Sequence, residues 1–314
     1  MGNEKSKISS YGNHNRKNRR TFTLKPLLIL KTKFELYWPL TKSLQTGLLL
    51  STGLAGYMSA RCPVMHWFDF VGLVVSLFMA IAGSTILNMW YDRDIDAQMK
   101  RTHMRPAASG KLDHREIFAV GLTISFLGVG WAFLIAPLYG LVVFAGWFFD
   151  VIVYTVWLKR RTCWSILWGG ISGAMPILSG RALAVGEIEL VGILLGLSIL
   201  FWIPTHTLTY SMKFRNDYKN AGVPTFPETY GERFTRMTIA ISSILAAIAI
   251  SWASVLIGLS AGLLSLIAVL TAVMLILAFA TLRIHTDKMN FMLFRYASLY
   301  MLSAMIILSI QGLI

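Results

Sequence analysis

Long apolar stretches separated by short polar ones make up most of the chain. Nine of these stretches follow one another, and each is long enough to cross the hydrocarbon core of a bilayer as a helix. They lie at residues 37–60, 66–91, 115–135, 138–158, 163–184, 187–212, 235–258, 261–283 and 292–313. The pattern therefore predicts an all-α membrane protein with nine transmembrane helices.

Basic residues orient these predicted spans. Of the 29 Lys and Arg residues, all except Arg61 and Arg181 lie in the N-terminal segment or in and beside the loops that follow the second, fourth, sixth and eighth spans. Short loops rich in Lys and Arg stay on the cytoplasmic side of a membrane. We therefore expect a cytoplasmic N-terminus and a C-terminus on the outside. The two long polar segments, at about 92–114 and 213–234, then share the cytoplasmic face, where we expect the chemistry.

The composition excludes several classes of protein. Charged residues are 14% of the chain, against about 25% in a soluble domain, and the mean hydropathy is +0.61. These values exclude a soluble enzyme, a disordered chain and a nucleic-acid-binding protein, even though the net charge is +14. We expect residues 1–34 to form a basic, disordered cytoplasmic tail and residues 35–314 to form the membrane domain. Cys62 and Cys163 fall on opposite sides of the predicted membrane, so we expect no disulfide between them.

The first polar segment carries three oxygen-bearing side chains at helical spacing. Asn88, Asp92 and Asp96 stand four residues apart, so they share one face of a helix. Arg101 and Arg105 follow. Mg²⁺ binds one or two carboxylates together with phosphate oxygens, and arginines hold the other oxygens of a phosphate. The segment therefore predicts a site for Mg²⁺ and a diphosphate.

The second polar segment repeats part of this design. Lys213 and Asp217 are four residues apart, and His206 and Tyr210 precede them along the same helical stripe. Two simpler interpretations stay open at this point. Lys213 and Asp217 are also spaced as a surface ion pair, and His206 as a hydrogen-bonded polar residue inside the bundle.

Two further groups are ordinary on their own. Asp94 is expected to point away from the trio and to be a solvated charge. Tyr154 followed by Lys159, Arg160 and Arg161 is typical of any span end, with an aromatic belt and cytoplasmic positive charge. Whether these two groups belong to a functional site depends on which residues lie near them in the fold.

These motifs resemble the UbiA-type intramembrane prenyltransferases. The resemblance rests on Asn88-x-x-x-Asp92-x-x-x-Asp96, on Arg101-Thr-x-x-Arg105-Pro106, and on a second polar segment four spans later. Within that superfamily the chain is most similar to the heme O synthase (protoheme IX farnesyltransferase) branch. That closer match uses Tyr154-Thr-x-x-Leu-Lys159-Arg160, Gly169-Gly170-x-x-Gly173-Ala174-x-Pro176, and Trp202 and His206 upstream of Asp217-Tyr218-x-x-Ala221-Gly222-Val223-Pro224. It covers residues 35–314 and implies a UbiA-like bundle.

Some positions depart from the pattern of the family. Thr225-Phe-Pro227 stands where the family usually continues with Met-Leu-Pro, and Ala107 follows Arg105-Pro106 where Leu is common. Lys213 occupies the place where most of the superfamily begins its second motif with Asp. These departures affect the prediction of the acceptor and of the length of the prenyl chain, but not the prediction of prenyl transfer itself.

The resemblance implies a Mg²⁺-dependent transfer of a farnesyl group from farnesyl diphosphate to a vinyl group of heme B, which gives heme O. Heme is then a substrate, and a heme A synthase is an expected partner. The implied metal ligands are Asn88, Asp92, Asp96 and Asp217. The implied diphosphate ligands are Arg101, Arg105, Lys159 and Lys213, and the catalytic set is Asp92, Asp96, Asp217 and Lys213. Contacts with the acceptor are implied for His206, Tyr210 and Tyr154, and His206 or His103 is the candidate iron ligand.

Other interpretations compete with this one. A UbiA-type enzyme with another acceptor, such as a quinone ring precursor, uses the same residues. A transporter would place charged residues near the middle of several spans, and a structural assembly factor has no need of two acidic sites. We expect a multi-pass protein of a prokaryotic cell membrane, with the mitochondrial inner membrane as the alternative.

Overall fold

The computed structural model describes residues 31, 33–60 and 67–311, and that part of the chain contains no β-strand. Its long helices are α2 (Ser43–Met58), α3 (Trp67–Tyr91), α5 (His114–Ile135), α6 (Pro137–Phe148), α7 (Ser165–Val185), α8 (Leu190–Lys213), α11 (Gly231–Ile257), α12 (Ala261–Arg283) and α13 (Asp287–Gln311). A π-helix, η2 (Phe149–Leu158), continues α6. The shorter elements are η1 (Trp38–Thr41), α4 (Arg93–Gln98), α9 (Arg215–Asn220) and α10 (Phe226–Thr229). The prediction of an all-α protein is confirmed.

Each predicted span contains one of the long helices, but not all of these helices qualify as membrane spans on their own. Within the described residues, seven segments are long and apolar enough to cross a bilayer, and α2 and α7 are not among them. Helix α2 has only 16 residues. The number of nine spans and the orientation of the two ends therefore stay predictions. Nearly all of the predicted tail and Cys62 lie outside the described residues.

The surface of the bundle is apolar. Large side chains such as Phe126, Leu134 and Ile276 are more than half exposed. Helix α12 buries few of its side chains against the rest of the protein. Soluble monomers rarely expose so much apolar surface. This surface therefore fits a protein that is solvated by lipid.

Two hydrophobic clusters build the interior, and α2 and α7 contribute to both. One cluster joins α7, α8, α11, α12 and α13, and the other joins α2, α3, α5 and α6. Helices α2 and α7 pack backbone to backbone between them: a Cβ on Gly56 would lie 2.1 Å from the Ile177 carbonyl oxygen, and one on Gly180 would lie 1.9 Å from the Gly53 carbonyl oxygen. Glycine is therefore required at this crossing.

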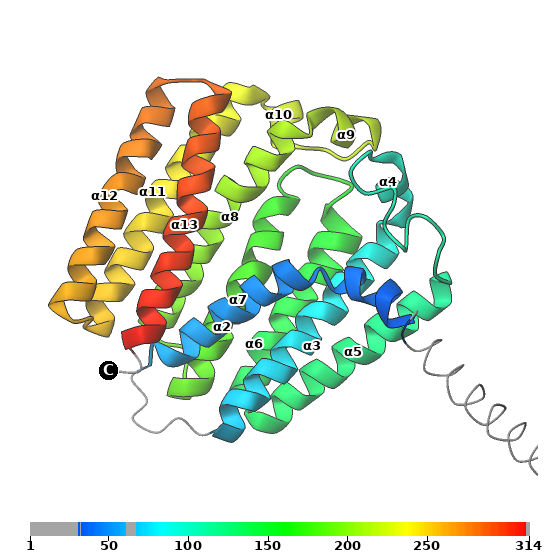
Figure 1. Cartoon of the computed structure of the whole chain (residues 1–314), viewed down its shortest axis with the longest axis horizontal. Coiled ribbons are helices and arrows are strands. Elements are labelled where there is room, and N and C mark those ends of the chain that lie inside the picture. Colours follow the sequence, from blue (N-terminus) through cyan, green and yellow to red (C-terminus); the bar gives the residue numbers. More distant parts are fainter. Residues whose placement is uncertain (1–30, 32, 61–66, 312–314) are drawn as a thin grey trace, which may run out of the picture.

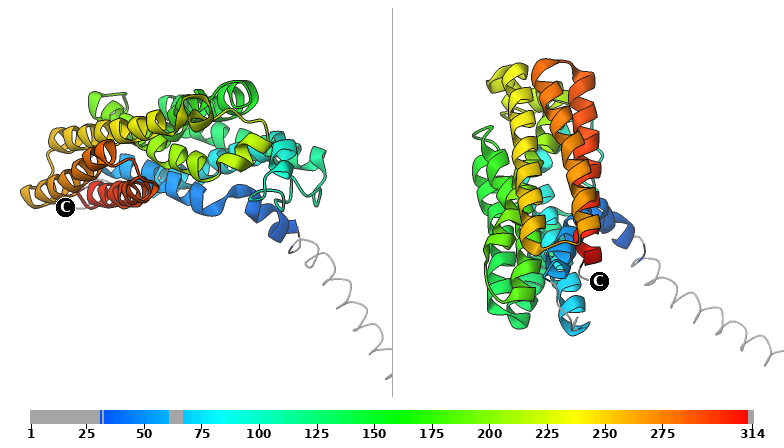
Figure 2. Two further views of the ribbon diagram at one scale, coloured as in Figure 1. Left: turned by 90° about the horizontal axis from the view of Figure 1, so that it is seen from above. Right: turned by 90° about the vertical axis from the view of Figure 1, so that its left-hand side faces the viewer.

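The polar elements gather at one end of the bundle (Figure 1). Helix α4 follows α3, and α9 follows α8, so both polar segments reach the same end (Figures 1 and 2). The π-helix η2 leads to this end as well, and Lys159 directly follows it. Extended π-helix is rare in proteins and is frequent at functional sites. The fold thus brings the ends of α3, η2 and α8 to one region.

Candidate active site

The two polar segments are in direct contact. Ile95 and Met99, on and just after α4, pack against Ala221 and Val223, which follow α9. Tyr218 of α9 covers this small cluster. The two segments therefore face each other, and they lie side by side in Figure 1.

Asp92 is the most deeply buried acid of the first segment. Its side chain is 2% exposed, and the carboxylate forms an ion pair with the ammonium of Lys159 through Oδ2. Its other oxygen, Oδ1, has no hydrogen-bond partner in the described part of the chain, and the nearest Arg160 nitrogen is 4.0 Å away. A buried carboxylate oxygen without a partner is costly, so Oδ1 is a natural point of attachment for a ligand.

The same ion pair fixes the charge of Lys159. Burial by itself lowers the pKa of this lysine, but the neighbouring Tyr154 and Asp92 outweigh burial and raise the pKa above its ordinary value. Lys159 therefore carries a positive charge at neutral pH. Its side chain is 18% exposed, so this charge lies inside the protein.

Asp96 repeats the arrangement one turn further on. Its side chain is 8% exposed, and Arg105 Nη1 donates to Oδ2 at 2.8 Å. The hydroxyl of Thr102 donates to the Asp96 carbonyl at 2.9 Å and folds the following loop back. Arg105 is thereby brought to the face that carries Asp92 and Asp96.

The predicted helical face continues across the boundary between α3 and α4. The amide of Asp92 donates to the carbonyl of Asn88, and that of Asp96 to the carbonyl of Asp92, at 2.9 and 2.8 Å. The Asn88 side chain donates from Nδ2 to Thr155 Oγ1 at 2.9 Å, and Thr155 in turn donates to the Asp150 carbonyl at 2.7 Å. The π-helix therefore orients Asn88 and leaves the amide oxygen for another partner.

Asp94 is not a simple solvated charge. Arg160 donates to both of its carboxylate oxygens, at 2.7 and 2.6 Å. This hydrogen bonding lowers the pKa of Asp94. The side chain is still 55% exposed, which agrees with the prediction that it points away from the trio. The pair joins α4 to the end of η2.

The second segment is organised differently. Lys213 forms no ion pair with Asp217 within the described residues. Its ammonium instead lies over the rings of Phe214 and Phe291, at 5.5 and 5.6 Å. The surface ion pair proposed as an alternative is therefore wrong. Asp217 is partly buried, and its carboxylate has no ion-pair or hydrogen-bond partner in the described part. Arg101 crosses from the first segment, with its guanidinium 5.2 Å from the centre of the Phe214 ring.

His206 and Tyr210 lie in an aromatic strip. The His206 ring is 5.3 Å from Trp202, 5.1 Å from Tyr210 and 5.2 Å from Phe294 of α13. Its Nδ1 is buried and has no hydrogen-bond partner among the described residues. The simpler interpretation, a hydrogen-bonded structural histidine, is not supported on that side of the ring. Tyr154 packs elsewhere, with its ring against Gly169 of α7 and below the Lys159 ammonium. His103 is exposed, and its Nδ1 contacts only the Lys100 carbonyl at 2.8 Å.

Two charged residues that sequence reasoning left unassigned also belong to this region. Lys42 lies within electrostatic reach of Asp96, Arg105 and Lys159. Asp150 interacts with Lys42 and lies inside the predicted fourth span. A carboxylate within an apolar span was a usable signal. Lys42 gave a weaker signal, because it lies near the start of the first predicted span, next to the basic residues of the N-terminal segment.

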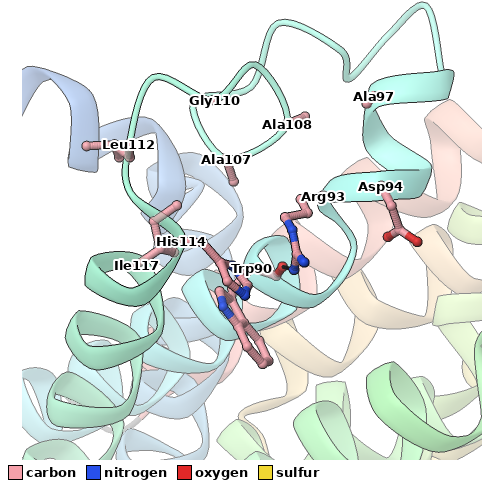
Figure 3. Close-up of a pocket in the computed structure, with 10 residues that line it drawn as sticks. All are labelled: Trp90, Arg93, Asp94, Ala97, Ala107, Ala108, Gly110, Leu112, His114 and Ile117. Atoms are coloured by element: carbon pink, nitrogen blue, oxygen red, sulfur yellow. Dashed lines mark hydrogen bonds between the residues drawn. The ribbon is translucent and has the colours of Figure 1, made fainter.

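A pocket of about 390 Å³ lies next to this site but is not part of it. Trp90, Arg93 and Asp94 line it from the junction of α3 and α4, and residues 107–114 close the other side (Figure 3). Neither Asp92 nor Asp96 reaches it. Within the described residues, no three His, Cys, Asp or Glu side chains come together to hold a metal ion by themselves.

Comparison with known proteins shows the family of the chain. A model of the UbiA prenyltransferase family matches residues 49–302. The protoheme IX farnesyltransferase of Archaeoglobus fulgidus is 42% identical over 233 residues, which are 74% of this chain and 81% of that protein. The Pyrobaculum islandicum protein of the same name is 37% identical over 69% of this chain and 78% of its own length.

Solved structures show the same fold. A structure from work on digeranylgeranylglyceryl phosphate synthase has a TM-score of 0.76 and 17% sequence identity, and the match covers 90% of this chain and 99% of that one. A UbiA homologue from Archaeoglobus fulgidus bound to DMAPP and Mg²⁺ has a TM-score of 0.64 and 16% identity, over 88% and 98% of the two chains.

Fold, polar end and membrane surface together define an integral membrane enzyme of the prenyltransferase class. The chain belongs to the UbiA prenyltransferase family.

Proposed function

We propose that this enzyme transfers a farnesyl group from farnesyl diphosphate to a vinyl group of heme B and so forms heme O. The observation that carries the proposal is the pair of buried acids, Asp92 and Asp96, each joined to its own cation, Lys159 and Arg105. Relatives named protoheme IX farnesyltransferase at 36–42% identity support the donor and the acceptor.

Mg²⁺ fits the acids that the structure places here. The free Oδ1 of Asp92 is a buried oxygen without a partner, and hard oxygen donors suit this ion. Asn88, Asp92, Asp96 and Asp217 would hold the metal together with the diphosphate. One or two carboxylates with phosphate oxygens are enough for Mg²⁺. When bound, the ion would supply positive charge for the departing diphosphate.

The cations of the chain would bind the other diphosphate oxygens. Lys159 and Arg105 already lie beside the acids, and Arg101 approaches from the same loop. Positive charge fixed before the reaction stabilises the negative charge that grows on the leaving group. Lys213 was assigned to the same task, but its contacts place it over Phe214 and Phe291.

The reaction breaks the bond between C1 of the farnesyl group and the diphosphate oxygen. The terminal vinyl carbon of heme forms the new bond to C1, and the positive charge moves to the carbon next to the porphyrin. Water adds its oxygen there and releases a proton, which gives a hydroxyethylfarnesyl group. The ring of Tyr154, which lies below the Lys159 ammonium, would help to keep bulk water from C1.

The product suggests where the enzyme acts. Heme O is a precursor of heme A, so a heme A synthase is the proposed partner, and the bilayer holds the apolar substrates. The relatives belong to archaea and bacteria, which favours a prokaryotic cell membrane.

The test uses membranes that contain the full chain, supplied with heme B, farnesyl diphosphate and Mg²⁺. Extracted hemes are examined by mass spectrometry for a hydroxyethylfarnesyl adduct, with and without EDTA. We expect an adduct that disappears when EDTA removes the metal. A parallel reaction offers an aromatic quinone precursor in place of heme. Prenylation of that compound without any heme adduct would contradict the proposed acceptor while keeping the reaction class.

A further inference from the structure

Three cations near the cytoplasmic ends of α8 and α13 alternate with aromatic rings. The Arg101 guanidinium lies 5.2 Å from the Phe214 ring, and the Lys213 ammonium lies 5.5 Å from the same ring. The Lys213 ammonium also lies 5.6 Å from the centre of the Phe291 ring. The guanidinium of Arg295, about one helical turn after Phe291, lies 4.6 Å from the same ring. We call Arg101, Phe214, Lys213, Phe291 and Arg295 the cation–ring ladder.

The ladder contains no counter-charge. Within the described residues, none of its three cations forms an ion pair with an acid, whereas Lys159 and Arg105 are both paired. Arg295 is the most unusual of the three. It stands eight residues after the start of α13, about 12 Å along the helix at 1.5 Å per residue. An unpaired charge in a membrane-spanning helix is costly and marks a functional site.

An aromatic strip continues from the ladder into the membrane domain. Tyr210 stacks on Phe214 at 5.8 Å with an angle of 12°, and Phe294 stacks on Phe291 at 5.5 Å. His206 lies between Tyr210 and Phe294, with its buried Nδ1 unpartnered among the described residues. Helices α8 and α13 run side by side here (Figure 1). They thus present a strip of rings that ends in cations.

This arrangement matches a flat, apolar ring system that carries carboxylates on one edge. Farnesyl diphosphate also joins an apolar chain to an anion, but its diphosphate is assigned to Lys159 and Arg105 beside the buried acids, which leaves the unpaired cations of the ladder for the acceptor. Heme B has a broad aromatic ring and two propionates on the same side. We propose that Lys213 and Arg295 bind the propionates of the acceptor while its ring lies along His206, Tyr210 and Phe294.

This inference rests on the proposed function and extends it. It assigns Lys213 to binding of the heme acceptor and no longer to binding of the diphosphate of the donor. It also gives a reason for a lysine at a position where the superfamily usually has Asp: a carboxylate there would repel a propionate. The acceptor enters with its charged edge at the cytoplasmic membrane surface, where a bound carboxylate keeps part of its hydration.

The test compares iron protoporphyrin IX with its dimethyl ester, which keeps the ring but has no charge on that edge. Purified full-length enzyme in lipid nanodiscs is titrated with each porphyrin, and binding is followed by the heme absorbance without farnesyl diphosphate. The variants are Arg295→Gln and Lys213→Gln. Lys288→Gln, an exposed cation on the first turn of α13 outside the ladder, is the matched control.

We expect each ladder variant to weaken binding of the diacid about tenfold, the scale of one charge-assisted hydrogen bond. Binding of the ester should change less than about twofold. The KM for farnesyl diphosphate should stay the same, and Arg295→Lys should recover most of the affinity for the diacid. Lys288→Gln should behave as the wild type.

Two results would overturn the inference. In one, the ladder variants weaken the diacid and the ester equally. In the other, they raise the KM for farnesyl diphosphate and leave porphyrin binding unchanged. Both assume a wild-type enzyme that prenylates heme. A wild type that forms no heme adduct would instead reject the proposed acceptor, so the two failures are distinguishable.

Discussion

The two polar segments meet at one end of the bundle but hold their charges in opposite ways. In the first segment Asp92 and Asp96 are 1% and 5% exposed, and each is paired with a cation. In the second, Asp217 is partly buried and unpaired among the described residues, and Lys213 lies over aromatic rings. The first segment is thus ordered by its own ion pairs, and the second is left with charges that a ligand can engage.

The two helix junctions have the same backbone pattern but carry different side chains. At each junction one residue, Asp92 or Phe214, departs from helical dihedral angles, and backbone hydrogen bonds between residues four apart continue across it. The junction residue of the first segment is an acid that pairs with Lys159, whereas that of the second is an aromatic ring beside the Lys213 ammonium. The same local backbone therefore carries an ion pair in one segment and a cation–ring contact in the other.

The largest expected effect comes from removing an ion pair of the first polar segment. Asp92→Asn removes the charge that holds Lys159 and the free oxygen proposed to bind the metal. We expect kcat to fall about 10³-fold, the scale reported for losing a charge-stabilising group in an active site. Heme O formation in membranes, normalised to the amount of folded protein, measures the effect.

The matched control is Asp94→Asn, two residues further on, in the first turn of α4. Asp94 binds Arg160 on a half-exposed face, and exposed pairs contribute little to stability. We expect nearly wild-type turnover from it. Similar losses in both variants would mean that α4 matters only for folding.

A smaller effect is expected in the second polar segment. Asp217→Asn removes a carboxylate that has no partner among the described residues, so no buried cation is left without a counter-charge. We expect activity to fall about 10- to 100-fold, mainly because more Mg²⁺ is needed for half-maximal rate. A Mg²⁺ titration of both variants checks the order. A loss at Asp217 as large as that at Asp92, with no change in Mg²⁺ dependence, would contradict the comparison.

Hydrophobic patterning predicted the helical fold well. Every predicted span contains one long helix, because a backbone in lipid must satisfy its hydrogen bonds within the segment. The i, i+4 spacing also predicted the shared face of Asn88, Asp92 and Asp96. What the pattern did not predict was the π-helix at 149–158, since its residues are as apolar as those of any α-helical span.

Contacts between distant segments were harder to predict. Lys159 and Asp92 are 67 positions apart, and so are Asn88 and Thr155. Their pairing depends on how η2 packs against α3, which no local pattern records. Nor does local spacing show that Lys213 lies over the rings of Phe214 and Phe291 and forms no ion pair with Asp217 within the described residues, because Phe291 belongs to the distant helix α13.

A moderate effect is expected where η2 supports the first segment. Thr155→Val removes the hydroxyl that accepts the Asn88 amide at 2.9 Å. Loss of one such hydrogen bond costs about 1 kcal/mol, and a freed Asn88 should lower turnover several-fold. Thr238→Val, which removes a hydroxyl bonded only within α11, is the control. Thermal unfolding and turnover are measured for both, and equal turnover would show that Thr155 does not orient Asn88.

The smallest expected effect sharpens the comparison through pH. Lys42 has a left-handed backbone with φ of 45°, a conformation that costs a residue other than glycine about 1 kcal/mol or more. Burial, with added repulsion from Arg105 and Lys159, lowers the pKa of Lys42 to about 8. Between pH 8 and about 10.4, the ordinary pKa of lysine, the Lys42 side chain keeps its proton in the unfolded chain but has lost it in the folded protein. Lys42 therefore adds stability as the pH rises through this window.

Activity should move in the opposite direction. Above pH 8 the neutral Lys42 no longer adds its charge beside Asp96 and Arg105, so kcat/KM for farnesyl diphosphate should fall a few-fold. That quantity reports the groups of the free enzyme. In Lys42→Arg the guanidinium keeps its charge, and the decline should vanish over the same range. A pH profile that is identical in the two proteins would assign the decline to another group and leave Lys42 as a purely structural residue.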